Sequence, residues 1–319
     1  MNIKFIFTFL SFISVNSKFT EKLHHVVNDG EQTGKCWVYN HLPKAGGTTI
    51  IHILQKIWGD RISLYGAGNW MKGDHFLKYF AENFYEKVED GKKNVLVGAY
   101  VEALMKPGFS ITKCKKFTVF RHPVSRMISA YYYCKYRGTD SLCGSQVIDN
   151  KNIDLVSFAK HWGNFAMRQF ILSYFSYDDV LDYADEHNIE PTVDVWYKLK
   201  NFMGSEDGAI YEHEMYELIE PVKEYISDNY VIGILENFNS TLELFDYELD
   251  MPLVNWKYEY SLQGLANKNK YDEEKKLSIL DAFSNENHEI YKYMELDILL
   301  YEHAVDVFHR QVNNMLANR

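Results

Sequence analysis

The sequence predicts an α/β fold in which a central, mainly parallel sheet is flanked by helices. Short apolar runs of strand type alternate with segments of helical period along the chain. Two turns with anion-binding residue types directly follow predicted strands, where open α/β sheets bind ligands. Helical pattern exceeds strand pattern, so helix-rich insertions are expected outside the sheet, within one domain over 35–319.

In the first half of the chain, the first predicted strand covers 36–42 and is stopped by Pro43. A helix is expected over 46–58, because its isoleucines and leucine recur at helical spacing. A second amphipathic helix is expected after it, followed by two short strands. These three elements cover 75–88, 94–101 and 116–120.

In the second half, Pro123 opens a helix at its first turn, where proline is tolerated. The last clear strand covers 230–235, between a helix ending near Asn229 and one starting near Asn237. The final stretch, 272–319, has an almost entirely helical pattern.

Composition predicts a globular chain and excludes several classes of function. Hydrophobic residues make up 46% of the chain and aromatic residues 16%, unlike a disordered protein. The net charge of −10 argues against a general nucleic-acid or anionic-membrane binder. One basic cleft for an acidic ligand stays compatible with this charge.

The N-terminus is typical of a secreted protein. A short basic start, 1–4, precedes an apolar run over 5–15 that is shorter than the about 20 residues of a membrane span. We expect a signal peptide over 1–17, with a short uncleaved signal-anchor as the alternative. A polar stem is expected over 18–34.

The four cysteines fit an oxidising lumen. Cys36 and Cys114 could pair if they begin neighbouring parallel strands, and the alternative is free buried thiols. Cys134 and Cys143 bracket a loop and form the other natural pair. Asn239 begins an Asn-Ser-Thr glycosylation sequon, usable only in a luminal chain.

The strongest local motif is the stretch 41–49, His-Leu-Pro-Lys-Ala-Gly-Gly-Thr-Thr. A strand, a glycine-containing turn and a helix start in this order aim backbone N–H groups and the positive helix end at an anion. Gly46 and Gly47 allow close approach of a phosphate, and Lys44 adds a charge. Two hydroxyl groups follow, those of Thr48 and Thr49. The alternative is an ordinary strand–turn–helix with a surface lysine.

The second motif brings an arginine to the end of a predicted strand, in the stretch 117–131. Arg121 can bind a phosphate through two parallel hydrogen bonds. Ser129 follows about two helical turns later, and Arg126 lies between them. For Arg126, a salt bridge on the helix surface is the alternative.

These two turns, 77 residues apart, suggest one ligand with two separated phosphate groups. They resemble the 5′-phosphosulfate loop and the 3′-phosphate site of carbohydrate sulfotransferases of the glycosaminoglycan type. The family's loop reads Pro-Lys-Thr-Gly-Gly-Thr, and Ala45 replaces its first threonine. The tyrosines at 131–133, with 230–236 and 286–291, resemble the heparan and dermatan or chondroitin 2-O-sulfotransferases more narrowly. The resemblance covers about 37–312.

The resemblance implies a P-loop-like nucleotide-binding fold and 3′-phosphoadenylyl sulfate as co-substrate, with no metal required. The sulfuryl group would pass to a carbohydrate hydroxyl, with Lys44 stabilising the leaving group. The nucleotide would be held by the loop residues Ala45, Gly46, Gly47, Thr48 and Thr49, with Arg121 and Ser129. In the family a basic loop also closes over the nucleotide, which corresponds to Lys268 here; a solvated linker is the equal alternative.

The family's histidine base is missing from its usual position. A Gly-His pair precedes the arginine motif in the 2-O-sulfotransferases, whereas Gly98 is followed by Ala99 here. Glu102 is the nearest titratable replacement for the base, and His75 is the second candidate. His75 opens an amphipathic helix, where a solvated surface histidine is the alternative. A catalytically degenerate relative that binds glycan or nucleotide is the competing hypothesis.

The resemblance also implies where the protein acts and on what. A carbohydrate or proteoglycan acceptor such as heparan sulfate is expected, in the Golgi lumen or at the Golgi membrane as a type II protein. A cleaved leader would instead allow secretion. No nucleic-acid partner is expected, and membrane contact only through the N-terminal anchor. The stretch 164–169 resembles a helix start that several family members place near the acceptor; a plain amphipathic helix is as consistent.

Overall fold

The protein is described by a computed structural model that covers 36–58, 62–67, 93–98, 114–137, 143, 152–174, 212–250, 272–285 and 288–319. The expected leader and stem lie outside these residues. So do three predicted site residues, His75, Glu102 and Lys268.

The core of the fold is a sheet of five parallel strands in the order β2-β3-β1-β4-β5. The strands are β1 (Cys36–Asn40), β2 (Ile62–Ala67), β3 (Lys93–Gly98), β4 (Lys115–Phe120) and β5 (Tyr230–Ile234). The predicted parallel α/β sheet is therefore confirmed. The edge strand β2 was not predicted, because Ile-Ser-Leu-Tyr-Gly-Ala is a mixed run with a glycine.

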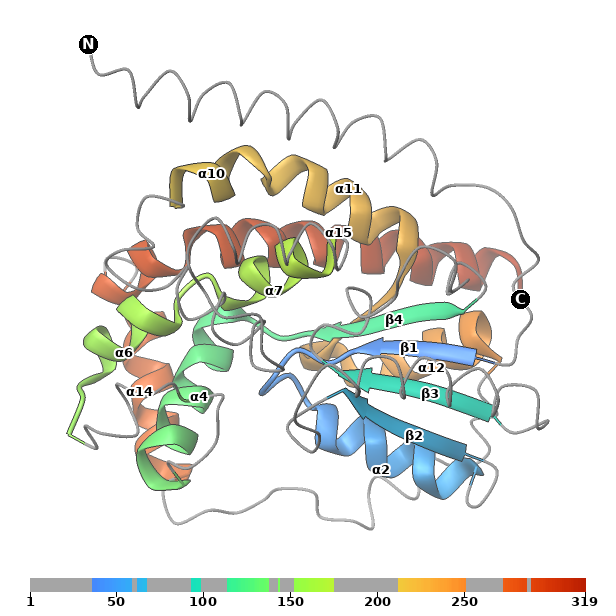
Figure 1. Ribbon diagram of the computed structural model, residues 1–319, viewed down its shortest axis with the longest axis horizontal. Helices are drawn as coiled ribbons and strands as arrows, with labels where there is room; N and C mark the ends of the chain where they lie inside the picture. The colour runs from blue at the N-terminus through green and yellow to red at the C-terminus, as the bar shows by residue number, and fades with distance from the viewer. Residues whose placement is uncertain are drawn as a thin grey trace, which may run out of the picture.

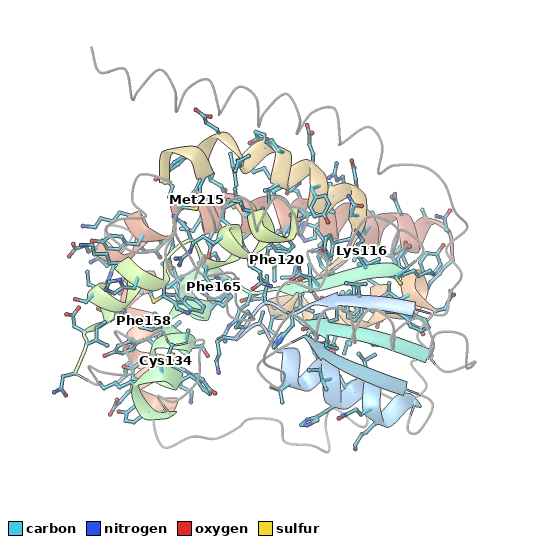
Figure 2. All side chains as sticks on the ribbon, in the orientation of Figure 1. Lys116, Phe120, Cys134, Phe158, Phe165 and Met215 are labelled. Carbon is cyan, nitrogen blue, oxygen red and sulfur yellow. A yellow bond between two sulfur atoms is a disulfide. The ribbon has the colours of Figure 1, made fainter. Side chains whose placement is uncertain are left out.

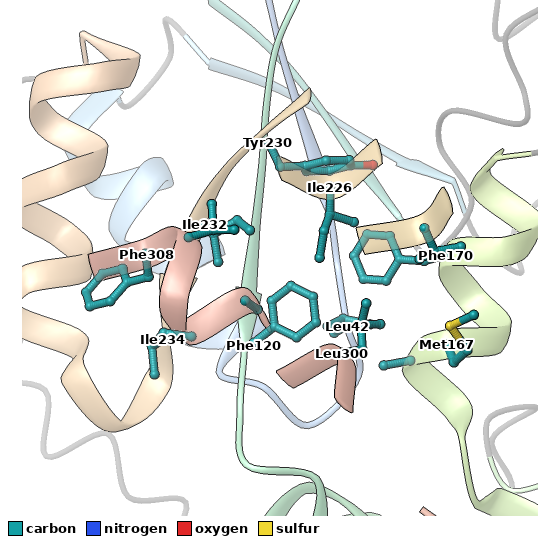
Figure 3. Close-up of a cluster of buried hydrophobic side chains, with 14 of the residues drawn as sticks. Leu42, Phe120, Met167, Phe170, Ile226, Tyr230, Ile232, Ile234, Leu300 and Phe308 are labelled. Carbon is teal, nitrogen blue, oxygen red and sulfur yellow. The ribbon is translucent and has the colours of Figure 1, made fainter. Parts of the chain in front are cut away.

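Helices cover both faces of the sheet, as predicted (Figure 1). One face carries α7 (Phe165–Tyr174), α11 (Ile219–Asn229) and α15 (Glu295–Ala317), and the other carries α2 (Gly47–Trp58) and α12 (Phe238–Leu249). Figure 3 shows the hydrophobic core between the sheet and the helices α7, α11 and α15, where Phe120 of β4 lies among Leu42, Phe170 and Leu300. None of the helices in the described ranges is long and apolar enough to cross a membrane.

A helical lobe lies beside the sheet and corresponds to the expected helix-rich insertions (Figure 1). It consists of α4 (Pro123–Arg137), α6 (Leu155–Trp162), α14 (Asp272–Ser284) and the short η6 (Glu289–Tyr293), which share a core of their own. Two further short helices are α10 (Glu212–Glu217) and η5 (Leu235–Asn237). Figure 2 places Cys134 and Phe158 in this lobe, and Lys116 and Phe120 at opposite ends of β4.

The disulfide predicted between Cys134 and Cys143 is present, and both cysteines lie in the core of the lobe. Cys114 is also disulfide-bonded, so the alternative of a free buried thiol is wrong for this residue. Its predicted partner, Cys36, has a side chain outside those described. The register of β1 and β4 pairs Trp37 with Lys115, which makes 36 and 114 neighbours and is consistent with the predicted pair.

The sequon asparagine Asn239 is exposed, but it stands in the first turn of α12 and not in a loop. The sequon hydroxyl, on Thr241, is buried and bonded to the N–H and C=O of Ile234 at 2.8 and 2.9 Å. Once α12 has folded, the Thr241 hydroxyl is buried and engaged in hydrogen bonds. Glycosylation at Asn239 stays a prediction.

A buried ion pair joins the lobe to the helices over the sheet. Arg126 of α4 contacts Asp297 of α15, and each side chain is only 2% exposed. Asp297 also accepts hydrogen bonds from the backbone N–H groups of Ala166 and Met167 at 3.2 and 2.8 Å, and so caps α7. Arg126 is therefore a buried structural cation: the suggested salt bridge is present, but it is buried and not on the helix surface.

Candidate functional site

The site predicted from the two motifs lies where neighbouring strands β1 and β4 end. From β1 the chain leads to the β2 edge of the sheet, whereas from β4 it leads to the β5 edge. Such a reversal of strand order leaves an opening at the carboxyl ends, where parallel sheets bind ligands. In Figure 1 these ends point toward the lobe that contains α4.

The loop after β1 adopts a conformation with left-handed backbone at two positions. Lys44 has φ 66° and Gly46 has φ 86°. A left-handed conformation is uncommon for a lysine and costs roughly 1 kcal/mol or more. A Cβ at Gly46 would also lie 2.7 Å from Cδ1 of Leu235, which would have to shift. The positive φ and this close approach together favour glycine at this position.

The helix that follows offers the N–H groups expected of an anion site. The first helical bond runs from Ile50 N–H to the Gly46 carbonyl at 3.2 Å, so the preceding N–H groups begin α2. Gly47 packs against the His41 ring, which a Cβ at this position would overlap. Thr48 is exposed and Thr49 is half-buried, so both hydroxyls lie near the surface at the positive helix end.

The side chain at position 45 of the loop faces the core. Ala45 is fully buried and belongs to the hydrophobic cluster between the sheet and α7, α11 and α15. It can contribute only backbone groups to a ligand.

The two predicted turns are in direct contact. Nη1 of Arg121 donates a hydrogen bond to the carbonyl of Lys44 at 3.2 Å. Burial lowers the pKa of Arg121, while the negative charge of Glu236 opposes this shift. An arginine remains a cation under such shifts. The guanidinium of Arg121 thus contacts the backbone of the first turn, 77 residues earlier in the chain, at the carboxyl ends of β1 and β4.

Helix α4 contacts the loop after β1 through Tyr133. Nζ of Lys44 lies 4.2 Å from the ring centroid of Tyr133, and Ser129 stands one helical turn before Tyr133 on the same face. Ser129 is 8% exposed. Lys44 therefore contacts the second turn through its carbonyl and α4 through its side chain.

A buried polar network holds the end of β1. The Asn40 amide oxygen accepts a hydrogen bond from Nε2 of Gln169 at 2.7 Å, and its NH₂ donates to the hydroxyl of Tyr230 at 3.1 Å. Thr118 of β4 donates to the Asn40 carbonyl at 2.8 Å. Gln169 lies on α7, so a helix is confirmed at the stretch 164–169. Through Gln169, this helix is hydrogen-bonded to the end of β1, just before the loop.

Glu236 supports the second turn in a similar way. Its carboxylate accepts hydrogen bonds from the backbone N–H of His122 at 3.0 Å and from the hydroxyl of Tyr301 at 3.2 Å. This links η5 and α15 to the residue directly after Arg121. Sequence reasoning missed Glu236, Asn40 and Tyr133 as parts of the site, because only long-range contacts distinguish them from other polar and aromatic residues.

His41 is kept neutral by its surroundings. Burial lowers its pKa to about 4, and the positive charge of Lys44 adds to this effect. In the unfolded chain a histidine titrates near pH 6.5. The unfolded state therefore binds a proton that the native state does not bind as the pH falls from about 6.5 toward 4, and stability falls in that window.

We expect His41→Asn to reduce this acid sensitivity. Between the two pKa values, His41 lowers the free energy of unfolding by about 1.4 kcal/mol for each unit by which the pH falls. Urea unfolding at pH 7, 6 and 5 should give a flatter dependence for the variant, while burial of His122 and His303, whose pKa values are also lowered, leaves a residual slope. His52→Asn, at an exposed position on α2, is the matched control. An unchanged slope in His41→Asn would contradict the assignment.

Within the described part of the chain, no group of three or more His, Cys, Asp or Glu side chains could hold a metal ion. No protein-family model matches the chain, and no curated protein sequence matches it.

Proposed function

We propose that this chain is a sulfotransferase that moves a sulfuryl group from 3′-phosphoadenylyl sulfate to a carbohydrate hydroxyl, on a P-loop-like nucleotide-binding fold. The observation that carries the proposal is the contact between Arg121 and the Lys44 carbonyl at the point where strand order reverses. It joins two anion-binding turns into one region, as a ligand with two separated phosphate groups requires.

The polar residues and glycines of the two turns have separate roles in this proposal. The acceptor oxygen attacks sulfur as the bond between sulfur and the bridging phosphate oxygen breaks, so negative charge grows on that oxygen. Lys44 and the N–H groups of Gly46 and Gly47 stabilise this charge. Arg121 and Ser129 bind the 3′-phosphate, and Thr48 and Thr49 add hydroxyl donors to the phosphosulfate.

Removal of the acceptor proton needs a base. Glu102 remains our first candidate and His75 the second, and both lie outside the described residues. The proposed acceptor is a glycosaminoglycan, which fits a secretory-pathway enzyme. The Cys134–Cys143 disulfide supports an oxidising compartment.

The proposal is tested by incubating the purified full chain with radiolabelled 3′-phosphoadenylyl sulfate and separate acceptors. Heparan, chondroitin, dermatan and galactose-terminated glycans form the panel. We expect label on one acceptor and release of adenosine 3′,5′-bisphosphate. Nucleotide binding without transfer to any acceptor would favour the degenerate binding protein, and absence of nucleotide binding would overturn the proposal.

Arg121→Ala is expected to weaken binding of adenosine 3′,5′-bisphosphate by about 1.5–3 kcal/mol, the range for hydrogen bonds to charged groups. Arg121→Lys should recover only part of this loss, because an ammonium cannot form two parallel hydrogen bonds. Isothermal titration calorimetry measures both. Arg310→Ala, at an exposed position on α15, is the control. Wild-type affinity in Arg121→Ala would move the 3′-phosphate site elsewhere.

A further inference from the structure

The ammonium of Lys44 lies over an aromatic ring, a contact that the roles above do not use. Nζ of Lys44 is 4.2 Å from the ring centroid of Tyr133, inside the range of about 6 Å for a cation–π interaction. Lys44 belongs to the loop after β1, and Tyr133 belongs to α4 of the helical lobe. The contact therefore connects the sheet to the lobe at the site itself.

The main chain of Lys44 is already fixed. Its left-handed φ of 66° sets the direction in which its side chain leaves the loop, and its carbonyl accepts the hydrogen bond from Arg121. The side chain itself is long, with four rotatable bonds. The fixed main chain therefore does not determine the position of the ammonium. The ring of Tyr133 contacts the ammonium and restricts its position.

The direction of Tyr133 is set by both of its neighbours in the chain. The hydroxyl of Tyr132, which is 6% exposed, lies 2.7 Å from the hydroxyl of Ser278 on α14. Cys134 is fully buried and disulfide-bonded to Cys143. Rotation of α4 about its axis would break both connections. The ring of Tyr133 is therefore presented to the loop by a rigid element.

We propose that Tyr133 is a positioning residue that holds the ammonium of Lys44 in place for an anionic ligand, an inference that rests on the proposed function. An ammonium carries three N–H donors. The ring lies 4.2 Å from Nζ, and contact with a π face uses none of the oxygen acceptors that a phosphate or phosphosulfate group would supply, so the two contacts are compatible. The ring thereby restricts a flexible side chain before the ligand arrives.

The first experiment reads the contact directly. Lysines of the full chain are reductively dimethylated with ¹³C-formaldehyde, which retains their charge, and the Lys44 methyl signal is assigned by its loss in Lys44→Arg. We expect an upfield ring-current shift of this signal in the wild type and in Tyr133→Phe. The shift should disappear in Tyr133→Leu. Tyr136→Leu, one turn later on α4 at an exposed position, should leave it unchanged.

The second experiment adds adenosine 3′,5′-bisphosphate as the probe. We expect the nucleotide to change the chemical shift of the Lys44 methyl signal in the wild type and in Tyr133→Phe. The change should be smaller in Tyr133→Leu. In unmodified enzyme, turnover should fall by about 3- to 30-fold in Tyr133→Leu and stay within about twofold in Tyr133→Phe. The loss should fall mainly on kcat, because the nucleotide keeps its other contacts.

The outcomes separate this inference from the function on which it rests. Absence of nucleotide binding by calorimetry in the wild type would overturn the proposed function and this inference with it. Intact binding, with a Lys44 signal that responds equally in wild type and Tyr133→Leu, would overturn this inference alone. Equal loss in Tyr133→Leu and Tyr133→Phe would also overturn it, since the phenylalanine ring retains the π face.

Discussion

Asp297→Ala is expected to lower the free energy of unfolding by about 3–5 kcal/mol, the largest effect on stability that we predict. Removal of the carboxylate would leave Arg126 buried without its counter-charge, because both side chains are only 2% exposed. The same change removes the acceptor for the N–H groups of Ala166 and Met167 at the start of α7. Arg126 is already destabilised as a cation by its removal from water, and this burial is the main cause of its lowered pKa. Loss of the carboxylate and of the N–H acceptor would destabilise the folded state further.

Chemical denaturation of the full chain measures this effect. Asp306→Ala is the matched control, because Asp306 is an exposed aspartate on the same helix, α15. The double variant Arg126→Met/Asp297→Leu should recover part of the loss, since an apolar pair leaves no unpaired charge. A loss in Asp297→Ala no larger than in Asp306→Ala would show that the pair contributes little to stability.

Lys44→Ala is expected to reduce turnover by about 10²–10³-fold while the protein stays folded, the size of effect seen when one charge-stabilising donor is lost. Lys44 lies at the contact of the two turns, where charge on the departing phosphate would develop. Because such stabilisation acts mainly in the transition state, kcat should fall more than nucleotide affinity.

Steady-state kinetics with the best acceptor, together with calorimetry for adenosine 3′,5′-bisphosphate, tests this prediction. Lys56→Ala, at an exposed lysine in the last turn of α2, serves as the control for loss of a positive charge. Circular dichroism establishes that the variant is folded. Unchanged turnover with weakened nucleotide binding would instead assign Lys44 to ground-state binding of the nucleotide.

Local patterns were sufficient for most elements of the sheet. The apolar runs near 36, 94, 116 and 230 become β1, β3, β4 and β5, and Pro123 opens α4 as expected. The strand expected over 36–42 ends earlier, at Asn40, because the chain already turns toward the loop. The strand β2 escaped prediction because its stability depends on pairing with β3 at the sheet edge, which is a contact and not a pattern.

The sequence by itself determined the two turns, since glycine spacing, a lysine and an arginine at strand ends are features of neighbouring residues. Only the tertiary structure decided that these turns meet, that Ala45 faces the core, and that Arg126 is a buried ion-pair partner. It also decided the places of Tyr133 and Glu236, which act on residues 89 and 114 positions away, Lys44 and His122. The physical reason is that burial and charge pairing depend on the order of the strands and on the rotation of α4 about its axis. Both are set by contacts between residues far apart in the sequence, so no short segment predicts them.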